Sequence, residues 1–179
     1  MSTDNTTIRD IMLPLSGFPS LAQTATVEEA IRQLHSFCPV GASGPCGFNE
    51  LMVVDDRGGL VGRITPQGVL RVLFSTLLES VDVKRFEGVK VEYSDLTTLL
   101  NGVILREGSN HLQAPLSSVI ERPAKILAPD DSLLHAMSCM VILKETSLPV
   151  AEGGKLVGVV QLTEIFSRIG DLLFTMNTN

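Results

Sequence analysis

The sequence contains one phrase twice, and this repetition constrains the fold more than any other feature. Leu-Val-Gly runs into apolar residues and then a helix-like segment in LVGRITPQGVL (60–70) and again in LVGVVQLTEIF (156–166). Each copy follows another short apolar run and a Gly-rich turn, LMVVDDRGG in the first and SLPVAEGGK in the second. Internal repetition of this kind indicates a chain built from two copies of one supersecondary unit.

The similarity between the copies extends upstream of the repeated phrase. TVEEA (26–30) and SLLHA (132–136) each open an expected helix, and Ile8 to Met12 aligns with Leu116 to Ile120. The first copy is longer than the second. We assign its extra residues to an enlarged loop at 36–50 (SFCPVGASGPCGFNE), because Gly, Pro and Ser are typical of loops.

Both copies predict the order β-α-β-β-α. In the first copy, Thr26 and Glu29 form a capping box at a helix start, and Thr65 followed by Pro66 marks the start of a second helix. The second copy has Ser132 as a helix cap and a last helix from about Thr163 to Phe174. The expected strands are LMVV and LVGRIT in the first copy and LPVA and LVGVVQ in the second, joined by polar Gly-containing turns.

Composition and charge exclude several classes of function. The 179 residues are 44% apolar and 19% charged, which is typical of a globular protein. The net charge is −6 and there is no run of Lys or Arg, so we expect no nucleic-acid partner. The N-terminus lacks the apolar core of a signal peptide, and the longest apolar run, Leu133 to Leu143, is too short to span a bilayer. We therefore expect a soluble, cytoplasmic protein without a membrane partner.

The three cysteines form no CxxC pair and their number is odd, which suits a reducing compartment. Cys38 and Cys46 share the enlarged loop, so a redox or metal role competes with the simpler interpretation of two loop thiols. No histidine lies in that loop to complete a ligand set, and this favours the simpler interpretation. We expect no metal site and no required cofactor.

The capped helix, the apolar strand in LPVAEGGKLVGVV, and a segment of the form G-h-h-T-x-x-D opening a helix together resemble the cystathionine-β-synthase (CBS) domain. Two such domains in tandem form a Bateman module. The resemblance runs from Ile8 to about Arg71 and from Leu116 to about Gly170. It implies an α/β (α+β) fold of two pseudo-symmetric repeats packed through their sheets. We divide the chain into a first repeat (1–71), a helical insertion or linker (72–115), and a second repeat with a C-terminal helix (116–179).

The resemblance also implies a class of function. CBS pairs are regulatory sensors that commonly bind AMP, ADP, ATP or S-adenosylmethionine in the cleft between repeats, and they commonly form homodimers. In the family motif, the Asp accepts hydrogen bonds from both ribose hydroxyls and the Thr or Ser contacts phosphate. A carboxylate held at a helix start is a fixed acceptor for a vicinal diol, and the backbone N–H groups there favour an anion.

The two copies depart from the family motif in different ways. The first copy keeps Thr65 but has Gly68 where the ribose Asp belongs, so it has lost the diol acceptor. The second copy has Gln161 in place of Thr and Glu164 in place of Asp, which keeps the charge on a side chain one methylene longer. We therefore expect any adenosyl site to lie at the second motif.

Several residues are candidates for nucleotide binding, and each also has a purely structural explanation. Thr65 serves equally well as a helix N-cap, Glu164 is favoured in a first helical turn by the helix dipole, and Gln161 can be a polar strand end. Ser147 stands before Leu148-Pro149-Val150, where the family often has a polar ligand contact. The basic residues that can offset phosphate charge, or simply be solvated, are Arg122, Lys125 and Arg63.

Two hypotheses from different classes follow. The first is a sensor that binds an adenosine derivative through the second motif and shifts the arrangement of a homodimer or of an unidentified regulated protein. The second is an interaction scaffold with degenerate nucleotide clefts, in which the 72–115 insertion makes a dimer or binds a partner. We expect no enzyme, because the sequence has no GxSxG, HExxH or P-loop motif and no identifiable acidic dyad.

Overall fold

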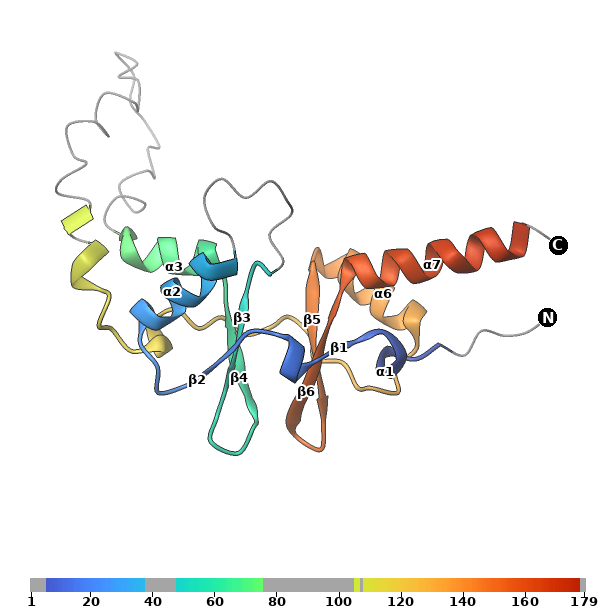
Figure 1. The fold of residues 1–179 in the computed structure, drawn as a ribbon, viewed down its shortest axis with the longest axis horizontal. Helices are drawn as coiled ribbons and strands as arrows, with labels where there is room; N and C mark the ends of the chain where they lie inside the picture. Colours follow the sequence, from blue (N-terminus) through green and yellow to red (C-terminus); the bar gives the residue numbers. More distant parts are fainter. Residues whose placement is uncertain (1–5, 38–47, 76–104, 107, 178–179) are drawn as a thin grey trace, which may run out of the picture. The chain divides into compact units, whose positions relative to one another are not determined.

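The structure, a computed structural model, describes residues 6–37, 48–75, 105–106 and 108–177. Most of the predicted 72–115 insertion and the loop that holds Cys38 and Cys46 therefore lie outside the described residues. Figure 1 shows the order of the elements. In chain order they are α1 (Ile8–Ile11), β1 (Leu13–Pro14), the 3₁₀ turn η1 (Leu15–Gly17), β2 (Ser20–Ala22), α2 (Val27–Phe37), β3 (Leu51–Val54), β4 (Leu60–Ile64), α3 (Pro66–Leu73), η2 (Leu116–Ser118), α6 (Leu133–Leu143), β5 (Ser147–Glu152), β6 (Lys155–Gln161) and α7 (Leu162–Asn177).

The strands form two three-stranded sheets, in the orders β2-β3-β4 and β1-β6-β5. In the first sheet, β2 pairs with β3 in parallel, with Leu21 opposite Val53. In the second, β6 pairs antiparallel with both β5 and the N-terminal strand β1. The mixed helix and sheet architecture predicted from the sequence is confirmed.

One strand of the second copy differs from the expected β-α-β-β-α order. Where the first copy has β2, the second has a single parallel bridge between Leu127 and Val150. The chain around it contains Pro123 and Pro129, which have no N–H to donate to a ladder, and this keeps the pairing short. The third strand of that sheet is β1, which pairs with β6 on the edge opposite to this bridge.

The helix caps form as the sequence predicts. The Thr26 backbone N–H donates to Glu29 Oε2 at 2.7 Å, and the Glu29 N–H donates to Thr26 Oγ1 at 3.3 Å, which completes the capping box. Ser132 Oγ accepts from the His135 N–H at 3.2 Å at the start of α6. These caps fix the starts of α2 and α6, the equivalent helices of the two copies. The last helix is longer than expected and runs from Leu162 to Asn177.

The start of each copy pairs with the start of a helix in the other copy. The Ile8 N–H donates to the Asp131 carbonyl at 2.9 Å, and the Leu133 N–H donates to the Thr6 carbonyl at 3.2 Å. Equivalently, the Leu116 N–H, at the start of the second copy, donates to the Ala25 carbonyl just before α2, at 3.4 Å. Because of this exchange, the two compact units of the structure mix the copies. Within the described residues, one unit comprises 6–23, 51–63 and 122–177, and the other comprises 24–37, 48–50, 64–75, 105–106 and 108–121.

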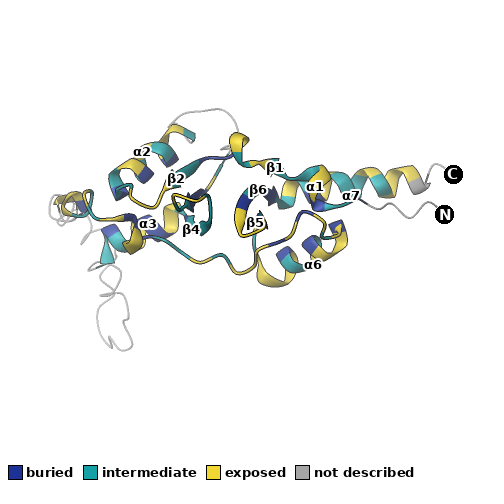
Figure 2. Ribbon diagram, turned by 90° about the horizontal axis from the view of Figure 1, so that it is seen from below, coloured by how far each residue is buried: buried dark blue, intermediate teal, exposed yellow. Residues whose placement is uncertain are grey.

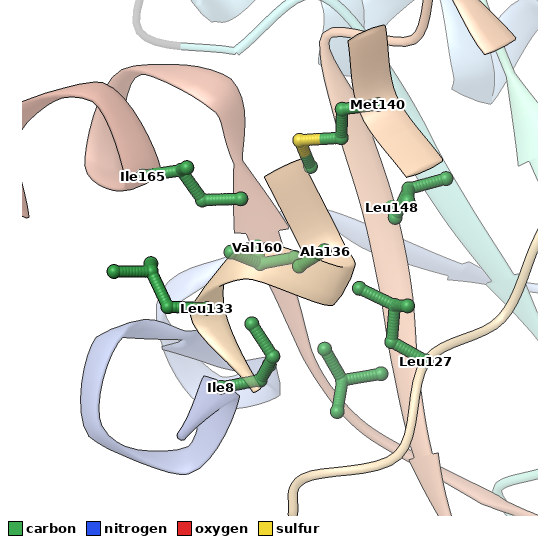
Figure 3. Close-up of a cluster of buried hydrophobic side chains, with 9 residues drawn as sticks. Ile8, Leu127, Leu133, Ala136, Met140, Leu148, Val160 and Ile165 are labelled. Carbon is green, nitrogen blue, oxygen red and sulfur yellow. The ribbon is translucent and has the colours of Figure 1, made fainter. Parts of the chain in front are cut away.

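The core of the larger unit lies among α1, α6, α7 and the sheet β1-β6-β5. Figure 3 shows Met140 and Leu133 of α6 and Ile165 of α7 in one cluster with Leu148 of β5 and Val160 of β6. Figure 2 shows the complementary exposed faces of α6 and α7. These helices therefore bury one side against the sheet that carries the second motif. The remaining members of this core cluster are Ile8, Leu127, Ala136 and Val150.

Candidate functional site

The first motif lies at the start of α3, and one side chain from a distant part of the sequence covers it. Thr65 is the N-cap of α3, and its Oγ1 accepts from the Gly68 N–H at 3.0 Å. The same hydroxyl donates to Glu121 Oε2 at 3.3 Å. Gly68 is buried, and a Cβ added there would lie 2.9 Å from Glu121 Oε1. The Glu121 carboxylate therefore occupies the space beside the first turn of α3.

The second motif lies where β6 feeds α7, and the strand register brings its polar residues together. Ser147 and Gln161 are direct cross-strand partners at one end of the β5–β6 pair. The Leu162 N–H then donates to the Thr146 carbonyl at 2.9 Å, which ties the start of α7 to the start of β5. Glu164 follows in the first turn of α7. Three of the predicted site residues, Ser147, Gln161 and Glu164, thus come from adjoining positions in one unit.

The side chains of the second motif differ in their burial and in whether the protein itself provides them with a polar partner. Ser147 is buried, whereas Gln161 and Glu164 are partly exposed. In the part of the chain that the structure describes, the Glu164 carboxylate has no hydrogen-bond or ion-pair partner. It stands in the first turn of a helix of 16 residues, where backbone N–H groups and the helix dipole favour negative charge. A half-exposed carboxylate without a partner remains able to accept hydrogen bonds from a ligand.

The predicted basic residues fall into two groups. Arg122 and Lys125 are exposed, and both precede Leu127 in the sequence. Leu127 forms a parallel bridge with Val150 of β5, so the chain that leads up to Leu127 comes from the Ser147 end of that strand. Arg63 is different, because its guanidinium donates to both carboxylate oxygens of Glu145 at 2.7 and 2.9 Å. Arg63 is therefore neutralised by the protein itself, whereas Arg122 and Lys125 remain exposed.

The family model of the CBS domain matches residues 8–75 and 116–171, on either side of the long connection between the copies. The chain belongs to the CBS domain family. The two matched segments confirm the predicted tandem pair. CBS domains are regulatory, non-catalytic modules that often bind adenosine ligands. A comparison with curated protein sequences gives no match.

Solved structures of CBS-domain proteins have the same fold. The CBS domain of a CBS-domain-containing membrane protein from Sphaerobacter thermophilus is 19% identical, with a TM-score of 0.61, covering 91% of this chain and 87% of that one. CBSX2 in complex with AMP is 16% identical, with a TM-score of 0.61 and coverages of 93% and 97%. A CBS-domain-containing protein of unknown function from Kribbella flavida is 15% identical, with a TM-score of 0.66 and coverages of 92% and 98%. At these identities the likeness concerns the fold.

In this CBS pair, the sequence did not point to Glu121 as part of either motif. The alignment that matches Ile8 with Leu116 also matches Leu13 with Glu121, so a carboxylate stands in the second copy where the first copy has an apolar residue. That difference is the only signal of Glu121 in the sequence, and it does not indicate the contact with Thr65. In the structure, the missing side chain of Gly68 leaves the room that Glu121 fills.

The described residues lack both a membrane-spanning helix and a metal-binding cluster. No helix in the ranges given above is long and apolar enough to cross a membrane. Those same ranges hold no group of three or more His, Cys, Asp or Glu side chains arranged to bind a metal ion.

Proposed function

We propose that this CBS pair is a non-catalytic regulatory sensor that binds an adenosine derivative at the second motif. In this proposal, Glu164 accepts hydrogen bonds from the ribose hydroxyls of AMP, ADP, ATP or S-adenosylmethionine. Gln161 and Ser147 contribute polar contacts at the adjoining strand ends, and Lys125 and Arg122 offset phosphate charge. Thr65, at the first motif, has no part in this binding.

The proposal rests chiefly on the Glu164 carboxylate and its lack of a polar partner among the described residues. Among the described residues it has no hydrogen-bond or ion-pair partner, and it stands beside Gln161 and its cross-strand partner Ser147. A ribose diol offers two O–H donors, and charge-assisted hydrogen bonds to a carboxylate are stronger than bonds between neutral groups. The AMP complex of the structurally similar CBSX2 supports an adenosyl ligand as the class to test.

Isothermal titration calorimetry of the full chain against AMP, ADP, ATP and S-adenosylmethionine tests this function. We expect at least one of the four to bind and Glu164→Gln to weaken that binding at least tenfold. Asp171→Asn is the matched control, because Asp171 is an exposed carboxylate on the same helix, away from its first turn. Absence of binding at millimolar ligand, or equal loss in both variants, would contradict the proposal.

We also propose that the working form is a homodimer in which α6 and α7 take part. Large apolar side chains are exposed on these helices, with Ile142 at 77% and Phe166 at 78% of full exposure. Such side chains gathered on two packed helices are typical of a surface that another protein covers. A ligand then acts by differential affinity for two arrangements of the dimer, which shifts their populations.

Light scattering on Ile142→Glu and Phe166→Glu tests the dimer, with Leu70→Glu as the control because Leu70 is an exposed apolar residue of α3. We expect the first two variants to have half the mass of the wild type and the control to keep the wild-type mass. A monomeric wild type would contradict the dimer.

The alternative is a scaffold without a nucleotide. It is favoured by the first motif, where Glu121 already engages Thr65. Deletion within residues 86–111, followed by light scattering, tests whether the insertion makes the dimer. In the scaffold hypothesis this deletion gives a monomer and the calorimetric titration gives no heat of binding. An unchanged dimer excludes the insertion as the dimer interface.

A further inference from the structure

The start of α3 already holds a carboxylate that belongs to the chain. Glu121 Oε1 lies 2.9 Å, and Glu121 Cδ 3.2 Å, from the point where a Cβ at position 68 would stand. The carboxylate thus fills the volume in which any side chain of residue 68 would begin. Because Gly68 has no side chain, Glu121 can approach this closely.

The same contact uses the hydrogen-bonding capacity of Thr65. Its hydroxyl oxygen accepts from the Gly68 N–H, and its single O–H donates to Glu121 Oε2. A phosphate at this position would have to compete with Glu121 for that proton. It would also have to approach a second negative charge at the same helix start, where the dipole favours one anion but two anions repel each other.

We propose that Glu121 is an internal anion that closes the first motif, so that this CBS pair binds its adenosine derivative at one motif only. In this proposal, the absence of a side chain at Gly68 provides the space that the Glu121 carboxylate occupies. The contacts described above support the closure of the first motif by Glu121. The prediction of one ligand per chain also rests on the proposed function.

The second motif has no equivalent of Glu121 in the alignment of the copies. The matching residue is Leu13, which lies in β1 opposite Val159 of β6 and has no charge to place at the start of α7. The difference between Leu13 and Glu121 therefore parallels the difference between Glu164, which has no partner among the described residues, and Thr65, which has one.

A double-mutant cycle on the full chain tests the closure without any ligand. The variants are Gly68→Ala, Glu121→Ala and the double variant, each measured by its urea midpoint. We expect Gly68→Ala to be more favourable in the Glu121→Ala background than in the wild type, because the added methyl group no longer meets the carboxylate. Gly17→Ala is the control, since a Cβ there meets nothing within 4 Å. Additive midpoints for Gly68→Ala and Glu121→Ala would overturn the proposal, and Glu121→Ser, which also removes the carboxylate, replaces Glu121→Ala if the latter fails to fold.

Calorimetry with AMP tests the consequence. We expect one AMP per chain in the wild type and a second, weaker equivalent in Gly68→Asp/Glu121→Ala, which exchanges the internal anion for a carboxylate at the family position. Two equivalents in the wild type, one of them lost in Glu121→Gln, would overturn the proposal and make Glu121 a ligand acceptor instead. If the wild type binds no AMP, nucleotide binding at the second motif is contradicted for this ligand, and the double-mutant cycle still decides whether Glu121 closes the first motif.

Discussion

Arg63 and Glu145 form a bidentate ion pair, with N–O distances of 2.7 and 2.9 Å, between β4 and the residue that follows the C-cap of α6. Their side chains are only 13% and 15% exposed. Two charges this far out of water are stable only as a pair, because each alone would lack most of its hydration. The pair therefore stabilises the larger unit close to Thr146 and Ser147, where the second motif begins.

Removing one partner of this pair should destabilise the protein strongly. Arg63→Met and Glu145→Gln are each expected to lower the free energy of unfolding by about 3 kcal/mol, since each removes one partner of a largely buried, bidentate ion pair. Arg9→Met is the control, because Arg9 is 47% exposed and its ion pairs with Asp130 and Glu152 lie at the surface. The control should lower the free energy of unfolding much less, because ion pairs at the surface contribute little to stability. Urea denaturation measures all three, and equal losses would contradict this ranking.

Gly158 should tolerate no side chain. A Cβ at this position would lie 2.5 Å from the backbone carbonyl oxygen of Leu13, because β1 passes directly over Gly158 in their antiparallel pair. Gly158→Ala is expected to cost about 3 kcal/mol, or to release β1 from the sheet. Hydrogen exchange of the β6 amides distinguishes the two outcomes. Wild-type stability and wild-type protection of β6 in this variant would refute the close approach.

Truncation of the core should be far more costly than truncation at the surface. Leu148 is fully buried in the cluster of Figure 3, so Leu148→Ala is expected to lower the free energy of unfolding by about 3 kcal/mol. Leu70→Ala removes the same atoms from a leucine that is 52% exposed, and should cost less than about 1 kcal/mol. Thermal denaturation of both variants tests the assignment of the core, which fails if the surface variant loses as much.

The Asp10 carboxylate should contribute to stability only above acidic pH. Hydrogen bonds from the Thr7 backbone N–H, and then from the Thr7 hydroxyl, lower the pKa of Asp10. Because the folded pKa lies below the unfolded one, the stabilisation is complete above the unfolded pKa of about 3.9 and is lost as the pH falls through the folded pKa.

An NMR titration of the Asp10 carboxyl carbon measures this shift. Thr7→Ala keeps the backbone donor and should reverse the shift only in part, whereas Asp10→Asn should remove the corresponding acid dependence of the unfolding free energy. A carboxyl group that titrates at the value of an unfolded chain would count against the capping interaction.

Local features of the fold could be predicted from the sequence because their causes lie within a few residues. The capping boxes and N-caps of Thr26, Thr65 and Ser132 depend on neighbours three positions away, and all three form as expected. The strands beside the Gly-rich turns follow from apolar runs and from residues that accept positive φ, such as Gly58 and Gly154.

The features that distinguish the two motifs depend on distant residues, and no local pattern predicted them. Glu121 reaches Thr65 across 56 positions, and Arg63 reaches Glu145 across 82. The sequence shows that Gly68 replaces the carboxylate of the family motif. It does not show that Glu121 fills the space beside Gly68, because only the tertiary fold brings Glu121 there. The binding roles of Glu164, Gln161, Ser147, Lys125 and Arg122 remain predictions, whereas the contact of Thr65 with Glu121 argues against the binding role predicted for Thr65.

The most direct test of the unequal motifs is an amide chemical-shift map recorded during titration of the ¹⁵N-labelled protein with AMP. We predict that the amides of Ser147, Gln161 and Glu164 shift in a saturable way, while those of Thr65 and Gly68 do not. Saturable shifts at Thr65 and Gly68, or none around Glu164, would contradict the account.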